Sequence, residues 1–395
     1  MSNNNKTPAI RFKGFTDTWE QRKLGDHSEI VAGGTPNTGH PEYWNPKEIP
    51  WMSSGEINNK VIYSTDNMIS KIGFSNSSAK WVKEKSVLIA LAGQGKTRGT
   101  VAISEIPLTT NQSIAAIQPD SFLYYKFLFQ NLEERYNELR EVSSGDGTRG
   151  GLNKQIISDL EVLAPEIQEQ IKIGDFLCGI DTLITLHQRK CDKLIQFKAA
   201  MLQKMFPQNG ANKPEIRFKG FSDAWEQRKV QDVADRFDNL RIPVAANLRV
   251  HGTTPYYGAN GIQDYVEGFT HDGEFVLVAE DGANDLKNYP VKCVNGRIWV
   301  NNHAHVLQGK AGIADNSFLA FAISQSDIES LLVGGGRAKL NAETLMSIEF
   351  RLPCLQEQYR IGEYLTQLDH LITLHQRKCD KYKSIKAGLI RKLFP

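Results

Sequence analysis

One block of sequence occurs twice in this chain, and this repeat constrains the fold more than any other feature. Leu183–Lys193 reads LITLHQRKCDK, and the same letters return without a change at Leu371–Lys381. The similarity begins at two Pro-x-x-Gln-Glu-Gln motifs and ends at two Phe-Pro pairs, Phe206-Pro207 and Phe394-Pro395, with a constant spacing throughout. Such agreement inside one chain indicates an internal duplication.

A second repeat precedes each of these blocks. Ile10–Phe15 followed by Trp19–Lys23 returns as Ile216–Phe221 followed by Trp225–Lys229. The chain therefore consists of two copies of one plan, a header, a body and a tail, and the two bodies show no resemblance to each other. A shared frame with unlike inserts predicts one scaffold that presents two different binding surfaces.

The tails have the periodicity of long helices. Apolar and small residues follow one another at alternating steps of three and four, which is a heptad seam. The seam positions are Leu177, Ile180, Ile184, His187, Cys191, Leu194, Lys198, Met201 and Met205, and in the second copy Leu365, Leu368, Ile372, His375, Cys379, Tyr382, Lys386, Leu389 and Leu393. Proline occurs only at the ends, so each helix is expected to run for roughly 60 Å. Two matched helices predict an antiparallel pair within the monomer that acts as a rigid spacer.

Polar residues on this seam leave alternatives open. His187 with Cys191, and His375 with Cys379, have the spacing from which two helices could assemble a zinc site. The simpler interpretation is that a thiol and an imidazole fix the register of the pair. The seam lysines, Lys198 and Lys386, suit a fraying helix end that meets solvent or a partner protein.

The first body contains a motif that suggests an enzyme. Ala90–Thr97 satisfies a loose phosphate-loop pattern and follows the strand-like Ser86–Leu91. A nucleotide-binding loop must lead into a helix, but the following Arg98–Ile103 is β-branched and predicts a second strand. The segment is therefore better interpreted as a hairpin tip that brings Gln94, Lys96, Thr97 and Arg98 to the phosphates and base edges of DNA.

The second body offers the segment Asn301-Asn-His-Ala-His305. Its alternate histidines suggest a metal, but no third ligand with suitable spacing accompanies them. The amides of Asn301 and Asn302 can pair with adenine and His303 can reach phosphate or base, although these residues could equally hold a turn.

Glycine-rich segments precede both tails. Ser143–Gly150 and Gly334–Lys339 place Arg149, Arg337 and Lys339 beside flexible glycines. This arrangement fits close approach to a DNA backbone, with a solvated connecting loop as the alternative.

Composition limits which classes of protein the chain can belong to. A chain of 395 residues with 40% hydrophobic content can form cores in two domains. The absence of an apolar run long enough to span a membrane favours a cytoplasmic protein with no membrane contact. Five scattered cysteines without a CxxC pair favour reduced thiols. Because the net charge is only +2, any DNA binding must depend on local patches, base contacts or a partner.

The order of these motifs, which is repeated in the two halves of the chain, resembles that of a type I restriction-modification specificity subunit. The supporting segments are Gly34–Pro36, Ile49–Trp51, Gly95–Gly99, Thr110–Ser113, Tyr256–Gly261, Asn301–His303 and the paired Pro-x-x-Gln-Glu-Gln helix entries. The resemblance implies a chain without catalysis of its own that reads a bipartite site in double-stranded DNA, one half-site per domain. It also implies two methyltransferase subunits and ATP-driven restriction subunits as partners, which would bind the S-adenosylmethionine, ATP and Mg, leaving this chain without cofactor or metal.

The expected fold class is α+β, with two mixed α/β target-recognition domains separated by two long antiparallel helices that form an intramolecular coiled coil with a pseudo-two-fold internal repeat. The expected domains are residues 1–160 (header and first recognition domain), 161–207 (first helix), 208–216 (linker), 217–350 (header and second recognition domain) and 351–395 (second helix). The candidate DNA-binding residues are Thr35, Tyr43, Ser53, Ser54, Gln94, Lys96, Thr97, Arg98, Asn111, Gln112, Arg149, Tyr256, Tyr257, Asn260, Asn301, Asn302, His303, Arg337 and Lys339. Two other functions remain open, a multivalent protein-binding adaptor and a phosphate-loop ATPase.

Overall fold

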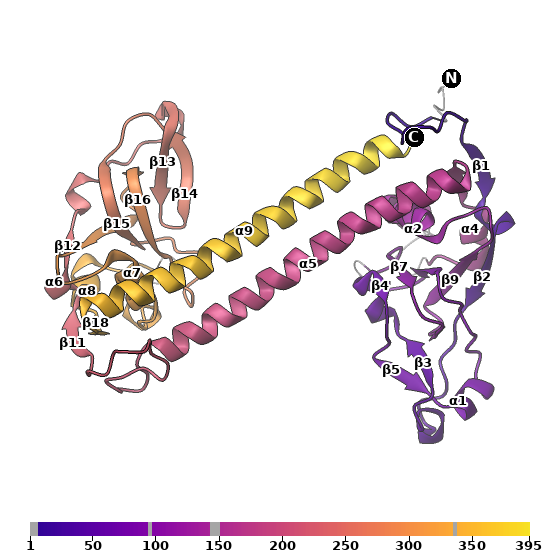
Figure 1. The fold of residues 1–395 in the computed structure, drawn as a ribbon, viewed down its shortest axis with the longest axis horizontal. Helices are drawn as coiled ribbons and strands as arrows, with labels where there is room; N and C mark the ends of the chain where they lie inside the picture. Colours follow the sequence, from indigo (N-terminus) through magenta and orange to yellow (C-terminus); the bar gives the residue numbers. More distant parts are fainter. Residues whose placement is uncertain (1–6, 94–96, 143–150, 335–337) are drawn as a thin grey trace. The chain divides into compact units, whose positions relative to one another are not determined.

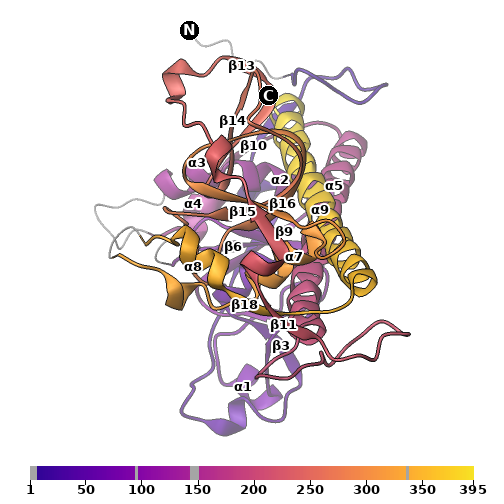
Figure 2. The same ribbon diagram turned by 90° about the vertical axis from the view of Figure 1, so that its left-hand side faces the viewer.

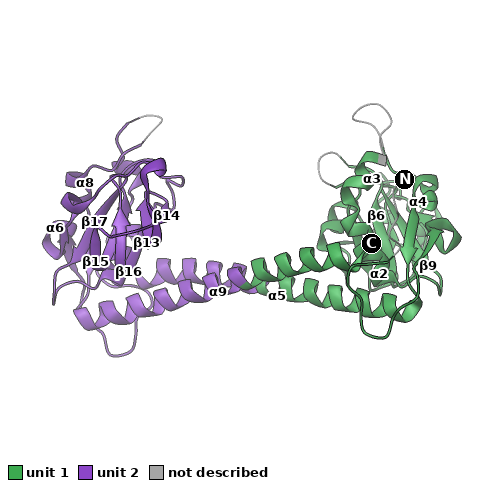
Figure 3. Cartoon of the chain, turned by 90° about the horizontal axis from the view of Figure 1, so that it is seen from above, with its two compact units in different colours: residues 1–187, 378–395 green, residues 188–377 purple. Residues whose placement is uncertain are grey.

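The computed structural model describes residues 7–93, 97–142, 151–334 and 338–395. The chain divides into two compact units, residues 1–187 with 378–395 and residues 188–377 (Figure 3). Each unit contains mixed β structure and half of each of two long helices, so the expected α+β fold class is confirmed. No helix in the described part of the chain has the length and apolar character needed to cross a membrane.

Unit 1 contains three small sheets (Figure 1). In spatial order, the strands are β2 (Ser28–Ala32), β9 (Ile114–Pro119), β6 (Ser86–Ala90), β7 (Val101–Ser104) and β4 (Val61–Ile62) in one sheet; β5 (Asn67–Ile69), β3 (Ile49–Met52) and β8 (Thr109–Thr110) in the second; and β1 (Glu20–Lys23) with β10 (Glu161–Ala164) in the third. Its shorter helices are α1 (Lys71–Ser75), α2 (Tyr125–Glu134), α3 (Tyr136–Val142) and α4 (Lys154–Asp159), with 3-10 turns at Leu24–Asp26, Pro41–Tyr43 and Ser54–Asn59.

The central strand of unit 1 is covered on both faces. All five residues of β6 are buried. Val87 and Ile89 pack with α2, whereas Leu88 and Ala90 pack with a second cluster that includes Met52. Burial on both faces explains why this strand has a continuous apolar sequence instead of the alternating pattern of a half-exposed strand.

Unit 2 is built around one larger sheet. Its strands in spatial order are β12 (Ala234–Arg236), β17 (Ala304–Gly309), β15 (His271–Ala279), β16 (Val291–Val300), β13 (His251–Gly258) and β14 (Gly261–Val266), with β11 (Glu226–Lys229) and β18 (Glu349–Leu352) as a separate pair. The shorter helices are α6 (Val230–Val233), α7 (Asn316–Ser324) and α8 (Ala342–Ser347), with 3-10 turns at Asp238–Leu240, Ala246–Leu248 and Glu329–Leu331. Helix α7 covers β15 and β16 (Figure 2). Its Phe318 and Leu319 join the main core.

The two tails form the long helices α5 (Ile167–Met205) and α9 (Leu355–Leu393), each of 39 residues. They pack antiparallel in both units. In unit 1 the Cys379 thiol faces the carbonyl of Ile184 at 3.9 Å, and in unit 2 the Cys191 thiol faces the carbonyl of Ile372 at the same distance. Every predicted seam position is buried or partly buried, so the heptad assignment and the antiparallel pairing are confirmed.

The prediction that the seam lysines meet solvent or a partner protein was wrong for Lys386. Lys386 is 7% exposed and its ammonium group lies 2.7 Å from carboxylates of both Glu133 and Asp181. Lys198, its counterpart in unit 2, lies 2.6 Å from Asp369. Each lysine thus pairs with a helix carboxylate from the other copy, because the long lysine stem reaches across the antiparallel seam.

The alternative of a zinc site on the seam has no support in the geometry. Among the described residues, the one group of three or more potential ligands that converges is Asp238, Glu280 and His305, in unit 2. On the seam, His187 stacks on Tyr382 with ring centroids 5.6 Å apart, and the Cys191 thiol faces the α9 backbone. These contacts fit the simpler interpretation, in which the thiols and imidazoles fix the register.

The repeated motifs interlock as a frame. Arg11 of the first header forms a forked ion pair with Glu169 of the first Pro-x-x-Gln-Glu-Gln motif, at 2.9 and 2.6 Å, and Arg217 forms the same pair with Glu357. The adjacent Gln170 is fully buried, donating to the carbonyls of Pro165 and Phe122 and accepting from the Tyr124 amide. The repeat therefore preserves a structural joint.

Each header also docks on the end of a long helix. Trp19 is 1% exposed and packs edge-on against Phe394, while Trp225 packs in the same way against Phe206. Unit 1 is consequently assembled from the beginning and the end of the chain, whereas unit 2 is one continuous segment.

Candidate nucleic-acid interface

In unit 1, three loops meet at one end of the β2–β9–β6 sheet. Strands β2 and β6 end there and β9 begins there, so the loop residues 33–35, 91–93, 97–100 and 111–113 are neighbours. The Leu91 amide donates to Ser113 at 2.8 Å, and the Gly34 amide donates to Thr110 at 2.8 Å. The sheet topology thus gathers candidate residues that are far apart in the sequence.

Two of the candidates in this cluster contact each other directly. The Thr35 hydroxyl donates to the Gln112 side chain, and both residues lie at the surface of the loop cluster. The approach requires glycine at position 33, because a Cβ there would lie 2.3 Å from the carbonyl of Asn111. Asn111 itself holds the loop, since its side chain accepts from the Ser113 amide at 3.1 Å.

The segment after β6 is a hairpin, as the sequence predicts. β6 pairs antiparallel with β7, and Thr97–Gly99 form a turn closed by the Gly99 amide, which donates to Ala90 at 3.0 Å. No helix follows β6 in the described part of this segment, so the geometry is not that of a nucleotide-binding loop. Thr97 and Arg98 lie on this turn, while Gln94 and Lys96 lie outside the described residues.

The other described candidates of unit 1 make contacts outside this pair of loop residues. The backbone amide and hydroxyl of Ser53 bond to the buried Glu56 at 2.8 and 3.0 Å, which caps the turn that contains Ser54. Tyr43 stacks on His40 with centroids 4.7 Å apart and lies against α1. Arg149 lies outside the described residues.

In unit 2, some candidates face the interior. Tyr256 is 1% exposed, and its hydroxyl accepts from the Val244 amide at 2.9 Å. Burial also raises the pKa of the Tyr257 phenol. Asn301 is buried, and its side chain accepts from the His303 amide at 2.8 Å. The side chains of these three residues are buried beneath the surface of the site. For Asn301 this agrees with the alternative in which its amide holds a turn.

The remaining candidates of unit 2 surround one loop, the residues 280–284 that follow β15. The Asn260 amide donates to Gly282 at 2.9 Å, His303 lies 2.6 Å from Asp281, and Lys339 lies 2.8 Å from Glu280. The Glu280 carboxylate also raises the pKa of Lys339. Asn302 is exposed beside them, and Arg337 lies outside the described residues.

Sequence reasoning missed this loop. β15 occupies in unit 2 the place that β6 occupies in unit 1, so residues 280–290 correspond to the hairpin tip after β6. Exposed Asn284, Lys287 and Asn288 therefore join the candidates. The signal was the strand-like Glu274–Ala279, whose end marks the hairpin.

An ion-pair network fixes the base of this loop. His305 lies 2.7 Å from Asp238 with its Nδ1 and 2.9 Å from the Leu340 carbonyl with its Nε2. Arg241 lies 2.6 Å from Glu280. Burial alone would raise the pKa of Asp238, but hydrogen bonds from His305 and the Val306 amide hold it below its usual value. Because cations already occupy the carboxylates, we assign the group to structure and not to metal binding.

Comparison with known proteins gives a consistent result. The family model for the type I restriction modification DNA specificity domain matches residues 16–196 and 222–383. The type I restriction enzyme MjaIX specificity subunit of Methanocaldococcus jannaschii is 32% identical over 323 residues, covering 73% of this chain and 72% of that protein. A Haemophilus influenzae protein described as a type I restriction enzyme specificity subunit is 44% identical over 146 residues, which cover 37% of this chain and 38% of that protein.

The fold also has a solved counterpart. The crystal structure of the type I restriction-modification system S subunit from M. genitalium superimposes with a TM-score of 0.74, covering 98% of this chain and 99% of that one. The sequence identity is 13%, so this likeness concerns the fold.

Proposed function

Because the chain belongs to the family of type I restriction-modification DNA specificity subunits, we propose that it reads a two-part DNA sequence, one part with each unit. This family is the non-catalytic component of its enzyme. The observation that carries the proposal is the combination of an equivalent frame with unlike sheets. Arg11–Glu169 and Arg217–Glu357 are the same joint, yet unit 1 carries a five-stranded and a three-stranded sheet where unit 2 carries one of six strands.

Two different loop clusters on equivalent frames suit two different short sequences. The reading surface of unit 1 would comprise Thr35, Gln112, Thr97 and Arg98, and that of unit 2 would comprise Asn260, Asn302, His303 and Lys339. Hydroxyl, amide, imidazole and cationic groups are the types that pair with base edges and phosphates. With a net charge of +2, the chain must obtain much of its phosphate contact from partners.

The long helices carry a surface suited to such partners. Leu183 and Leu186 are 38% and 45% exposed in unit 1, and their counterparts Leu371 and Leu374 are 41% and 38% exposed in unit 2. Exposed apolar residues at equivalent places on two units suit two copies of one protein. We propose that these are the two methyltransferase subunits, and that restriction subunits join the complex. S-adenosylmethionine, ATP and Mg would then be bound by those partners.

Methylome sequencing tests the proposal. A host that carries this gene and its methyltransferase partner should show modified bases in a bipartite motif, and the motif should disappear when this gene is deleted. A methylome that does not change on deletion would contradict the proposal and favour the protein-binding adaptor.

The part played by each unit is tested by exchange. Replacing residues 24–160 with the body of a relative should change one half of the motif and leave the other half as it was. A change in both halves at once would show that the units do not read independently.

A further inference from the structure

Unit 1 contains a cavity at the end of its main sheet that lies away from the reading loops. It is formed where β2 and β6 begin and β9 ends, while the reading loops lie at the opposite ends of the same strands. Its volume is about 510 Å³, within the roughly 300–1,000 Å³ usual for small-molecule sites. The cavity is therefore separate from the proposed DNA interface and independent of it.

The floor of the cavity contains an unsatisfied polar group. Gln118 is 8% exposed, and its buried Oε1 has no hydrogen-bond partner among the described residues. The same is true of the buried Ser28 hydroxyl on the adjoining strand. A buried acceptor without a donor costs roughly 1–3 kcal/mol, so a ligand that donates to it would recover that energy.

Unit 2 has a glutamine at the equivalent position of its sheet. Glu29 pairs across the sheet with Gln118, and Asp235 pairs in the same way with Gln308. Gln308 donates to the Glu274 carbonyl at 3.0 Å, so that side chain is engaged within the chain. The two glutamines at this equivalent position thus differ, because Gln308 has a partner within the chain whereas Gln118 Oε1 has none among the described residues.

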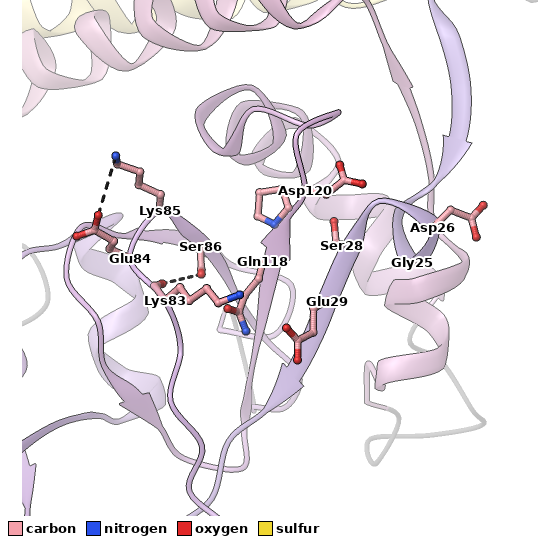
Figure 4. Close-up of a pocket in the computed structure, with 11 residues that line it drawn as sticks. Gly25, Asp26, Ser28, Glu29, Lys83, Glu84, Lys85, Ser86, Gln118 and Asp120 are labelled. Atoms are coloured by element: carbon pink, nitrogen blue, oxygen red, sulfur yellow. Dashed lines mark hydrogen bonds and ion pairs between the residues drawn. The ribbon is translucent and has the colours of Figure 1, made fainter.

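Charges of both signs surround the cavity. Figure 4 shows Glu84 and Lys85 together on one side and Asp26 and Asp120 on the other, while Lys83 and Glu29 flank Gln118 at the centre. Glu84 lies 4.0 Å from Lys85, and Asp120 lies 3.1 Å from His27. For Lys83, Asp26 and Glu29 no ion pair is found among the described residues. Beside Gln118, Lys83 is thus suited to a carboxylate and Glu29 to a cationic N–H donor.

We propose that this cavity binds a small zwitterion with a guanidinium or ammonium group at one end and a carboxylate at the other, the chemistry of a basic amino acid. The cationic group faces Glu29 and donates to Gln118 Oε1. The carboxylate faces Lys83. Such charge-assisted hydrogen bonds are stronger than neutral ones, and the planar fork of a guanidinium suits a carboxylate beside an amide oxygen.

The test is calorimetric titration of the full chain with L-arginine. Two further probes remove one feature each: agmatine lacks the carboxylate, and L-citrulline lacks the positive charge. We expect saturable binding of L-arginine and at least tenfold weaker binding of both other probes. Absence of saturable L-arginine binding overturns the proposal, and equal affinity for agmatine or L-citrulline overturns the zwitterion assignment.

Variants locate the binding. Gln118→Leu and Glu29→Gln should each weaken L-arginine binding at least tenfold, whereas Asp235→Asn, the matched change in unit 2, should leave it unchanged. Gln118→Leu should also keep or raise the melting temperature without ligand, because an unsatisfied amide is replaced by an apolar group of similar size. Undiminished binding by a folded Gln118→Leu variant overturns the site.

Discussion

Lys386 is the most deeply buried cation of the helix pair, and its environment sets its energetic role. Its side chain is 9% exposed between carboxylates of Glu133 and Asp181. In the equivalent pair of unit 2, Lys198 is 20% exposed and Asp369 is 46% exposed. Removing one partner of a buried ion pair leaves the other charge uncompensated, whereas an exposed pair contributes little.

Lys386→Met is therefore expected to lower the free energy of unfolding by about 3–5 kcal/mol. Lys198→Met, the matched control, should cost about 1 kcal/mol or less. Chemical denaturation of the two purified variants measures both values. Equal losses would show that burial does not distinguish the two pairs.

The same contacts predict a pH dependence. Burial alone would raise the pKa of Glu133, but Lys386 and Lys60 hold it below its usual 4.5. Burial alone would lower the pKa of Lys386, but Glu133 and Asp181 raise it above 10.5. The carboxylate contribution is thus complete above about pH 4.5 and lost as pH falls further, and the lysine contribution is complete below 10.5 and lost as pH rises through the raised value.

We accordingly expect the stability difference between the natural chain and Lys386→Met to be largest near neutral pH and to shrink below about pH 4, where protonation removes the unpaired carboxylate charges. Urea denaturation of both proteins at neutral pH and below about pH 4 provides the measurement. A difference that grows in acid would contradict the assignment of charge.

The neighbouring residues Asn301 and Asn302 are expected to have different roles, one structural and one in contact with DNA. Asn302 is exposed on the turn, whereas Asn301 is buried and holds the His303 amide. If Asn302 pairs with a base, Asn302→Ala should cost about 1–3 kcal/mol of discrimination at one position of one half-site, with the melting temperature unchanged. Asn301→Ala should instead lower the melting temperature. Binding to a panel of half-site variants distinguishes them, and uniform affinity across the panel would remove Asn302 from the base contacts.

At the level of elements, the long helices approach their units through glycine. A Cβ at Gly174 of α5 would lie 2.7 Å from the backbone nitrogen of Phe127 in α2, and one at Gly362 of α9 would lie 3.0 Å from that of Phe318 in α7. A Cβ at Gly179 would meet nothing within 4 Å. A Cβ at Gly388 of α9 would also meet nothing within 4 Å. The helices can therefore tolerate alanine at Gly179 and Gly388 but not at Gly174 and Gly362.

Gly174→Ala is expected to destabilise unit 1 by roughly 1–3 kcal/mol, because backbone must move to admit the methyl group. Gly179→Ala should stabilise the chain by about 0.5–1 kcal/mol, since alanine is the better helix former. Thermal unfolding compares the two. The interpretation fails if both changes have the same sign.

The sequence predicted the elements that depend on local pattern. Heptad spacing gave the two helices, their pairing and their register, and β-branched residues after Arg98 predicted the β6–β7 hairpin. It did not predict that Lys386 would be buried, because its partner Glu133 belongs to the body and not to the repeat. It likewise placed Tyr256 at the surface, whereas parallel pairing of β13 with β16 turns this ring inward.

At the scale of the whole molecule, both long helices run without a break through the boundary between the units, at His187 and Arg377. We propose that their common length sets the gap between the two half-sites. A heptad inserted after Gln188 and another after Gln376 would lengthen both helices at this boundary, so each unit would keep its own contacts with the pair.

This insertion adds about 10 Å, or at most roughly 3 base pairs of spacer. Methylome mapping of the variant should show unchanged half-sites at a wider gap, with activity reduced by the accompanying rotation of the duplex. Insertion of a heptad into α5 alone is the control and should disrupt the pair. Full activity with an unchanged gap would mean that another feature sets the distance.

The docking of the first header on the last helix has a consequence for synthesis on the ribosome. Unit 2 is contiguous and can close once residue 377 has emerged, but unit 1 must wait for residues 378–395, which bring Lys386 and Phe394. The part translated first is thus completed last, against the usual order in which an N-terminal domain folds first. A premature stop after Arg377 would therefore leave unit 2 complete but deprive unit 1 of residues 378–395.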